Sequence, residues 1–224
     1  MKRICRYLPI LSLPLLCVPF ASAQSSVDFM LGFGTAHDGA NGGGIDNASS
    51  INAYGACTPN SGDTYCQANP TLSAFFLGFG GDVMLWKHFG IGAAADVMPA
   101  RSDYGPLLYR QAFYDVNGIF RPFSSKRVAL QLEGGIGGAH TGFGVTESGG
   151  CVGTAVCTPN QTEPVGSSNH FDVHVGVGVS LFVTEHIFIR PQFDLHYAPG
   201  LTNQFSSNAV PAGMVWVGYS FGDR

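Results

Sequence analysis

The stretch HFDVHVGVGVSLFV, residues 170–183, alternates large apolar side chains with small or polar ones. Side chains of a β-strand point to opposite faces in turn, so Val175 and Val177 share one face while Asp172 and His174 share the other. A soluble sandwich buries the valine face in its core, whereas a membrane barrel turns that face to lipid and the polar face to its lumen. The rest of the sequence has to decide between these two arrangements.

Seven further segments of about ten residues show the same alternation. They lie at residues 27–36, 72–86, 89–98, 108–120, 128–141, 187–197 and 214–222. A tilted membrane strand needs about 9–11 residues, which these segments match. Short polar turns (KH, SSKR and TEH) join three successive pairs, whereas the segments 38–71 and 147–169 are long. Short turns at one end and long loops at the other predict an all-β, eight-stranded antiparallel up-and-down transmembrane barrel, with the short turns in the periplasm and the long loops outside.

The faces opposite the apolar ones are rich in glycine, alanine and serine, with isolated charges. An eight-stranded barrel has just enough interior space for side chains to fill it, so these faces fit a lumen. Because buried charges need partners, we expect a packed polar lumen that holds an ion network. Its expected members are Asp82, Asp96, Asp115, Glu133 and Arg190, joined by Asp172, Asp194 and, as a further candidate, Arg121. We expect Arg190 to neutralise the pair of Glu133 and Asp115.

The first 23 residues have the order of a secretory signal peptide: three basic residues, an apolar run and the small residues ASA. Cleavage is expected before Gln24, which leaves one barrel domain over residues 24–224. Removal of three of the eleven basic residues leaves eight against fifteen acidic ones, a formal charge of −7. This charge argues against a nucleic-acid partner.

Four cysteines remain after the expected cleavage, and they form two close pairs. Cys57 lies near Cys66, and Cys151 lies near Cys157. In an oxidising compartment two local disulfides are the simplest arrangement, although four cysteines allow three connectivities. We therefore expect disulfide-stapled loops.

The strongest constellation for chemistry is His170, Asp172 and His174 on one strand, with Asp194 and His196 on the next. A turn near residues 184–186 places His174 opposite His196, with about 5 Å between their Cβ atoms. Imidazoles backed by carboxylates are ligands of zinc and copper sites. The same spacing also arises in any hydrogen-bonded lumen network, which is the interpretation we adopt. We expect no metal and no cofactor, and the candidate ligands of the alternative metal site are Asp172, His174, Asp194 and His196.

Together these features resemble the small OmpA/OmpX-type outer-membrane barrels, which share the signal peptide, eight alternating strands, asymmetric connections and an aromatic-rich last strand, here VWVGYSFGDR at 215–224. The resemblance implies a multi-pass protein in the outer membrane of a Gram-negative cell envelope. It also implies contact with outer-membrane lipid and lipopolysaccharide, and assembly by the barrel-assembly machinery. That family ends its last strand on an aromatic residue, whereas here Phe221 is followed by Gly-Asp-Arg.

The resemblance also includes barrels that deacylate or palmitoylate lipid A with serine and histidine on the lipid-facing surface. None of the five histidines from His140 onward has a serine two positions later, which is the spacing of the deacylases. We therefore expect no enzymatic activity and no catalytic residues. The expected function is a non-enzymatic integral outer-membrane barrel with a structural or surface-interaction role, its long loops offering a surface for an extracellular ligand.

Four alternatives to this interpretation remain open from the sequence. A narrow pore for small solutes, a lipid A-modifying enzyme and a soluble β-barrel binding module are the functional ones. A ten-stranded barrel, with extra short strands in the long first loop, is the structural one.

Overall fold

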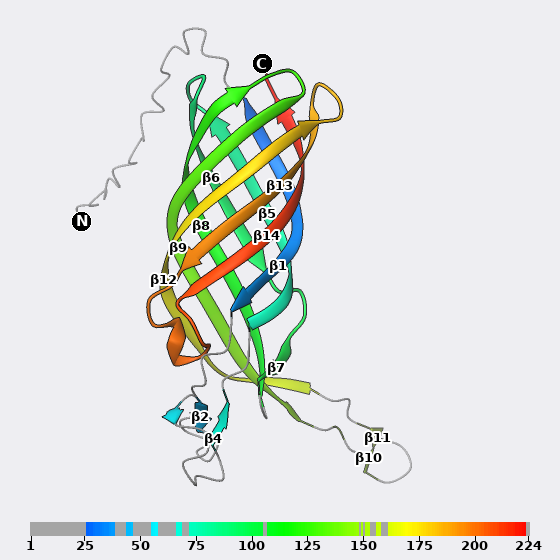
Figure 1. Cartoon of the computed structure of the whole chain (residues 1–224). Helices are drawn as coiled ribbons and strands as arrows, with labels where there is room; N and C mark the ends of the chain where they lie inside the picture. Colours follow the sequence, from blue (N-terminus) through cyan, green and yellow to red (C-terminus); the bar gives the residue numbers. More distant parts are fainter. Residues whose placement is uncertain are drawn as a thin grey trace, which may run out of the picture.

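The structure is a computed structural model of the chain, and it describes residues 26–38, 44–46, 55–57, 66–68, 72–104, 107–147, 149, 151–152, 156–157 and 161–222. Eight long strands in these residues close into one antiparallel barrel (Figure 1). They are β1 (Val27–Asp38), β5 (Leu72–Met84), β6 (Phe89–Val97), β8 (Leu107–Ser124), β9 (Val128–Glu147), β12 (Gln161–Phe182), β13 (Ile187–Tyr197) and β14 (Ala209–Phe221). Each pairs with its neighbours along the chain, and β14 pairs with β1 to close the barrel. The predicted eight-stranded up-and-down topology is confirmed.

The remaining elements are short. β2 (Gly44–Asp46), β3 (Gly55–Cys57) and β4 (Cys66–Ala68) form a separate three-stranded sheet, β7 (Ser102–Tyr104) pairs with β8, and β10 (Cys151–Val152) pairs with β11 (Val156–Cys157). The ten-stranded alternative is therefore wrong for the described residues, because the short strands of the first loop pair with one another and not with the barrel. The 3-10 helix η1 (Leu201–Asn203) lies between β13 and β14. No helix in the described part of the chain is long and apolar enough to cross a bilayer.

The connections differ in length at the two ends of the barrel. Tight turns at residues 85–88, 125–127 and 183–186 lie at one end, which is uppermost in Figure 1. The four longer connections, at residues 39–71, 98–106, 148–160 and 198–208, lie at the other end. The predicted asymmetry is confirmed, and we call the two ends the turn end and the loop end.

The hairpin of β9 and β12 is longer than its sequence pattern indicated. We expected strands at residues 128–141 and 170–183, whereas β9 continues to Glu147 and β12 begins at Gln161. The extra residues pair with each other along the hairpin, with one irregularity at Pro164–Gly166. Apart from Phe143 and two valines they carry small or polar side chains, because this part of the hairpin lies beyond the lipid-facing band, so no regular alternation signals a strand there.

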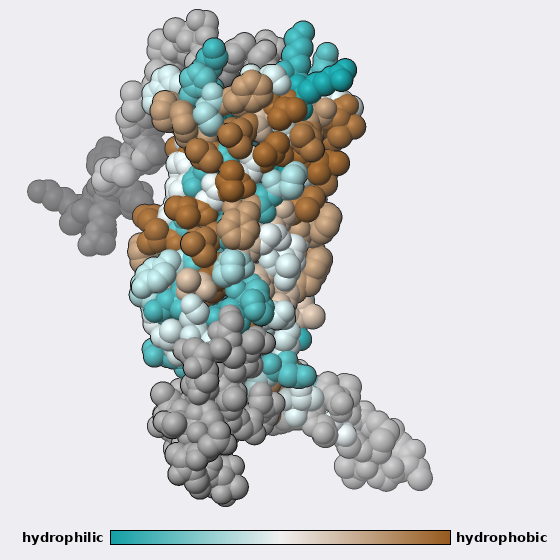
Figure 2. Space-filling view, in the orientation of Figure 1, coloured by the Kyte–Doolittle hydropathy of each residue, from teal (hydrophilic) through white to brown (hydrophobic). Residues whose placement is uncertain are grey.

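The outer surface of the barrel carries a band of large apolar side chains (Figure 2). Phe29, Leu31 and Val116 are each more than 60 % exposed, and exposed apolar residues occur on all eight barrel strands. A soluble monomer rarely exposes an apolar patch larger than a few hundred Å². The valine-rich faces therefore meet lipid, and the barrel is a transmembrane one.

Aromatic rings gather in this band near the turn end. The rings of Phe89 and Phe120 stack with centroids 5.0 Å apart, and those of Phe29 and Phe221 meet edge to face at 5.9 Å. Trp86, in the turn before β6, is 63 % exposed. Aromatic girdles of this kind mark the boundary between hydrocarbon and headgroups in membrane barrels.

Two glycines make room in the lumen for one large side chain. Trp216 on β14 is buried, and its ring lies against Gly32 on β1 and Gly78 on β5. A Cβ atom at Gly32 would lie 2.6 Å from the ring, and one at Gly78 would lie 2.5 Å from it. The small residues of the lumen face are therefore required by packing, as expected of a narrow barrel.

Candidate functional site

Two arginines and two aspartates form an ion network in the lumen, which we call the arginine network. The Nη2 atom of Arg121 lies 2.5 Å from Asp28 Oδ2 and 3.6 Å from Asp82 Oδ2. Arg190 Nη1 lies 2.8 Å from the same oxygen of Asp82. Gln131 accepts a hydrogen bond from Arg121 Nε at 2.9 Å and donates one to Asp82 at 3.0 Å. These side chains fill the lumen towards the turn end with paired charges.

This network differs from the predicted one in its partners. The ion pair of Arg190 is with Asp82, whereas Glu133 and Asp115 both face His174. Asp28 was not predicted as a member, although the alternation along β1 places it on the inward face and was the signal that could have identified it. Alternation fixes the face of a side chain but does not say which residue of another strand it meets.

Two histidines lie side by side in the middle of the lumen. The register of β12 and β13 places His174 directly opposite His196, as the sequence predicted. Their rings stack with centroids 5.1 Å apart and planes at 21°, and the ring of Phe113 stacks on His196 at 4.5 Å. Both imidazoles are buried. Stacking therefore holds their ring nitrogens in place among the neighbouring carboxylates.

Three carboxylates face His174. Its Nε2 lies 3.3 Å from Glu133 Oε1 and 3.6 Å from Asp194 Oδ1. Its Nδ1, on the other side of the ring, lies 3.9 Å from Asp115 Oδ1. Gln192 donates hydrogen bonds to both Glu133, at 2.5 Å, and Asp194, at 2.9 Å. Glu133 and Asp194 thus have partners other than the histidine.

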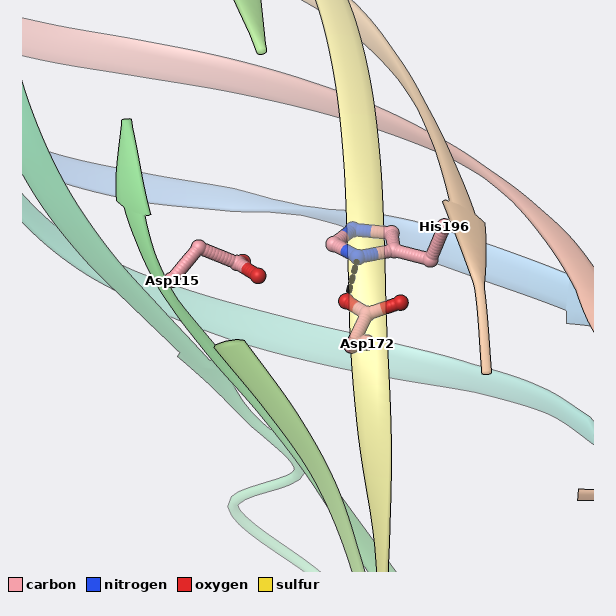
Figure 3. A group of neighbouring side chains, drawn as sticks. All are labelled: Asp115, Asp172 and His196. Carbon is pink, nitrogen blue, oxygen red and sulfur yellow. Dashed lines mark hydrogen bonds and ion pairs between the residues drawn. The ribbon is translucent and has the colours of Figure 1, made fainter. Parts of the chain in front are cut away.

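His196 belongs to a second group, with Asp172 and Asp115 (Figure 3). The hydrogen bond between His196 Nδ1 and Asp172 Oδ2 is 2.7 Å long, and the carboxyl group of Asp115 is directed towards Asp172. Asp115 on β8 and Asp172 on β12 both lie opposite Gly137 of the intervening β9. A Cβ atom at Gly137 would lie 2.6 Å from Asp115 Oδ1. The glycine leaves the space in which the two carboxylates meet.

Asp96 completes the set of predicted lumen residues. It lies on β6, is buried, and has one carboxylate oxygen, Oδ1, without a hydrogen-bond partner. That oxygen lies 2.6 Å from the position of a Cβ atom at Gly78, beside Trp216. The structure therefore places every predicted lumen residue inside the barrel, whereas their functional roles stay predictions.

Aromatic side chains that the sequence analysis did not identify close the loop end of the lumen, and we call them the aromatic plug. The ring of Tyr104 on β7 contacts Tyr109, Phe143 and Phe205, with centroids 5.9, 4.9 and 5.7 Å away. The hydroxyl of Tyr104 donates a hydrogen bond to the carbonyl of Gln204. Tyr104 and Phe205 lie in connections without strand alternation, so no sequence pattern predicted that they cover the lumen.

A groove on the outer surface lies between β8, β9 and β12 near the loop end. It has a volume of about 670 Å³, and Arg101, Arg110 and His140 contribute to its lining. Arg110 Nε donates a hydrogen bond of 2.7 Å to the Met98 carbonyl. Because Arg110 shares the outward face of β8 with the exposed Tyr114, this basic groove borders the apolar band.

Two groups of predictions fall outside the described residues. The structure does not describe residues 1–23, so the signal peptide and the boundary at residue 24 stay predictions. The side chains of the four cysteines are not described either. The backbone places Cys151 directly opposite Cys157, while Cys57 and Cys66 lie on β3 and β4, on either side of β2. Both disulfides therefore stay predictions.

Solved structures of other proteins have a similar fold. The attachment invasion locus protein Ail of Yersinia pestis, in complex with the heparin analogue sucrose octasulfate, matches with a TM-score of 0.50 and 12 % identity over 88 % of this chain and 99 % of that one. Neisserial surface protein A matches with a TM-score of 0.50 and 9 % identity over 90 % and 98 % of the two chains. Both are small eight-stranded outer-membrane barrels. No protein-family model and no curated protein matches the sequence.

Proposed function

We propose that this chain, which has the fold of the small eight-stranded outer-membrane barrels, is a non-enzymatic outer-membrane protein with a structural or surface-interaction role. The observation that carries the proposal is a lumen filled at both ends, by the arginine network and by the aromatic plug, inside a barrel with a lipid-facing surface. A filled lumen leaves no path for solutes, which disfavours the narrow-pore alternative. The outer surface and the loops are then the parts of the protein that can bind a partner.

Export and assembly are part of the same proposal. The charged, apolar and small-residue order of residues 1–23 supports export through a cleaved signal peptide. The aromatic-rich β14, which pairs with β1 to close the barrel, supports folding by the barrel-assembly machinery. We also propose that disulfides staple the extracellular loops, and the opposed backbone positions of Cys151 and Cys157 support the second of them.

Gel mobility and conductance together test the closed barrel. The mature chain, residues 24–224, should migrate faster unboiled than boiled after refolding in detergent, because a closed barrel resists unfolding by detergent alone. In planar bilayers it should give no conductance steps, with a known porin as the positive control. A chain that stays soluble without detergent and shows no mobility shift would contradict the membrane barrel. Stable single-channel steps would contradict the filled lumen.

The basic groove supports lipopolysaccharide as a surface partner. The phosphates of lipopolysaccharide lie at the outer edge of the hydrocarbon layer, which is where Arg101 and Arg110 lie relative to the apolar band. Guanidinium groups bind phosphate oxygens in pairs through parallel hydrogen bonds. The groove thus matches the lipid headgroup in charge and in position.

Replacing both Arg101 and Arg110 with glutamine should lower the amount of lipopolysaccharide that stays bound to the purified barrel. The reason is the loss of two positive charges at the headgroup level while the apolar band is unchanged. The matched control replaces Lys126 and Arg127, two exposed basic residues in a turn at the other end, with glutamine. Quantifying bound lipopolysaccharide by mass spectrometry checks this, and equal amounts on both variants would refute the groove as a binding site.

A further inference from the structure

The two histidines and the carboxylates around them form a compartment in the middle of the lumen that the proposed function does not use. We propose that Asp115, Asp172 and His196 bind a divalent transition-metal ion of the zinc type in this compartment. The three residues come from three strands, β8, β12 and β13, so the site forms only when these strands and the intervening β9 have paired. The inference is independent of any surface role.

Negative charge in the compartment exceeds the positive charge that the protein supplies. The two buried arginines form ion pairs with Asp28 and Asp82. Two histidines then remain for the carboxylates near them, which are Asp96, Asp115, Glu133, Asp172 and Asp194. Even if both histidines are protonated, three of the five carboxylates have no positive charge to pair with. Unpaired carboxylates in a low-dielectric interior must be neutralised by protons or by a cation.

Buried atoms without hydrogen-bond partners mark where the cation binds. Asp115 Oδ1, Asp172 Oδ1 and His174 Nδ1 have no such partner, and their residues are 6, 0 and 3 % exposed. Buried polar atoms in native proteins are almost always hydrogen-bonded, so the two atoms of Asp115 and His174, which lie 3.9 Å apart, need an explanation. Figure 3 shows the carboxyl group of Asp115 directed towards Asp172 and His196. An ion between these groups supplies the missing partner.

His174 has the arrangement that is typical of a metal-binding histidine. Such residues donate the hydrogen of one ring nitrogen to a carboxylate and bind the metal with the other. Here Nε2 faces Glu133 at 3.3 Å, which leaves Nδ1 on the side of Asp115, 3.9 Å from Asp115 Oδ1. Its ring is held by stacking on that of His196, so an ion bound at Asp115 has His174 Nδ1 as its candidate fourth ligand without rotation of the side chain. Glu133 then acts as a positioning residue behind it.

The donor atoms select the class of metal. The ligand atoms of Asp115, Asp172 and His196 all lie within 4.8 Å of one another, so small side-chain movements bring them to a common ion at about 2.0–2.2 Å. Carboxylate oxygens with imidazole nitrogens suit zinc and its first-row neighbours, whereas calcium and magnesium prefer oxygen ligands alone. The group of Glu133, His174 and Asp194 is the less suitable site, because Gln192 already donates hydrogen bonds to both of its carboxylates.

The experiment loads the full mature barrel with zinc during folding, because the finished lumen is filled at both ends. The chain is denatured in the presence of a chelator, which is then removed. It is refolded in detergent with and without zinc chloride, and free metal is removed on a desalting column. Mass spectrometry of the metal content should give one zinc per folded barrel. The zinc-loaded barrel should also melt at a higher temperature, because the ion binds only the folded state. Folded wild-type barrel that retains no zinc would overturn the proposal.

Matched variants separate this site from adventitious binding. The double variant Asp115→Asn with Asp172→Asn keeps the size of both side chains and should lose the zinc. The control, Asp103→Asn with Glu163→Gln, removes the same charge from two exposed residues outside the lumen and should retain it. Equal retention by the two variants would overturn the proposal. Each variant is first shown to fold by its gel mobility, and His196→Gln replaces the double variant if that one does not fold.

Cobalt gives a readout that needs no variant. Wild-type barrel refolded with cobalt should show the intense visible absorption bands of a four-coordinate ion with nitrogen and oxygen ligands. The weak spectrum of the fully hydrated ion would overturn the proposal and would mean that protons neutralise Asp115 and Asp172 instead.

Discussion

Replacing Val177 with arginine should destabilise the barrel by about 2–4 kcal/mol, the penalty for a cation on the lipid face near the bilayer midplane. Val177 is 41 % exposed on the outer surface and lies on the apolar face of β12, between Phe171 and Leu181. Its cross-strand neighbours are Phe193 and Leu132, which face lipid with it. An arginine there has no water and no acidic partner within the band.

The matched control is Ser167→Arg on the same strand. Ser167 is exposed but lies beyond the apolar band, so arginine there should cost about 0–1 kcal/mol. Urea unfolding in lipid vesicles, followed by gel mobility, measures both free energies of unfolding. A soluble barrel would show similar small effects at the two positions. That outcome would mean that the valine face is not in contact with lipid.

Replacing Arg190 with methionine should cost about 3–5 kcal/mol, the range for removing one partner of a buried ion pair. Arg190 is 1 % exposed, and its guanidinium lies 2.8 Å from Asp82. Without it, Asp82 keeps only the more distant Arg121, at 3.6 Å, and Gln131. The cost arises from a buried carboxylate that has lost its nearest cation.

A double variant identifies the source of this cost. Adding Asp82→Asn to Arg190→Met removes the stranded charge and should restore part of the lost stability, which shows as non-additivity in a double-mutant cycle. Arg127→Met, in an exposed turn, is the control and should change the free energy of unfolding by less than about 0.5 kcal/mol. An unchanged melting temperature in Arg190→Met would rule out a stabilising role for the arginine network.

The sequence determined the eight barrel strands and their faces, apart from the loop-end extensions of β9 and β12. A strand repeats every two residues, so Val175 and His174 were assigned to opposite faces without knowledge of any neighbour. The short turn at residues 183–186 also fixed the register of one hairpin, which is why the pairing of His174 with His196 was predictable. Local periodicity and tight turns are properties of short segments, and a sequence displays them directly.

Only the tertiary structure decided which inward side chains meet. Asp115 and Asp172 lie on strands that are separated by β9, and they approach each other because both lie opposite Gly137. Arg190 meets Asp82 for a similar reason, since contacts across the lumen depend on the tilt and stagger of the closed barrel. Tyr104 and Phe205 cover the loop end from connections that have no periodicity. Closure of the sheet is a property of all eight strands together, and therefore no single segment carries a signal for these contacts.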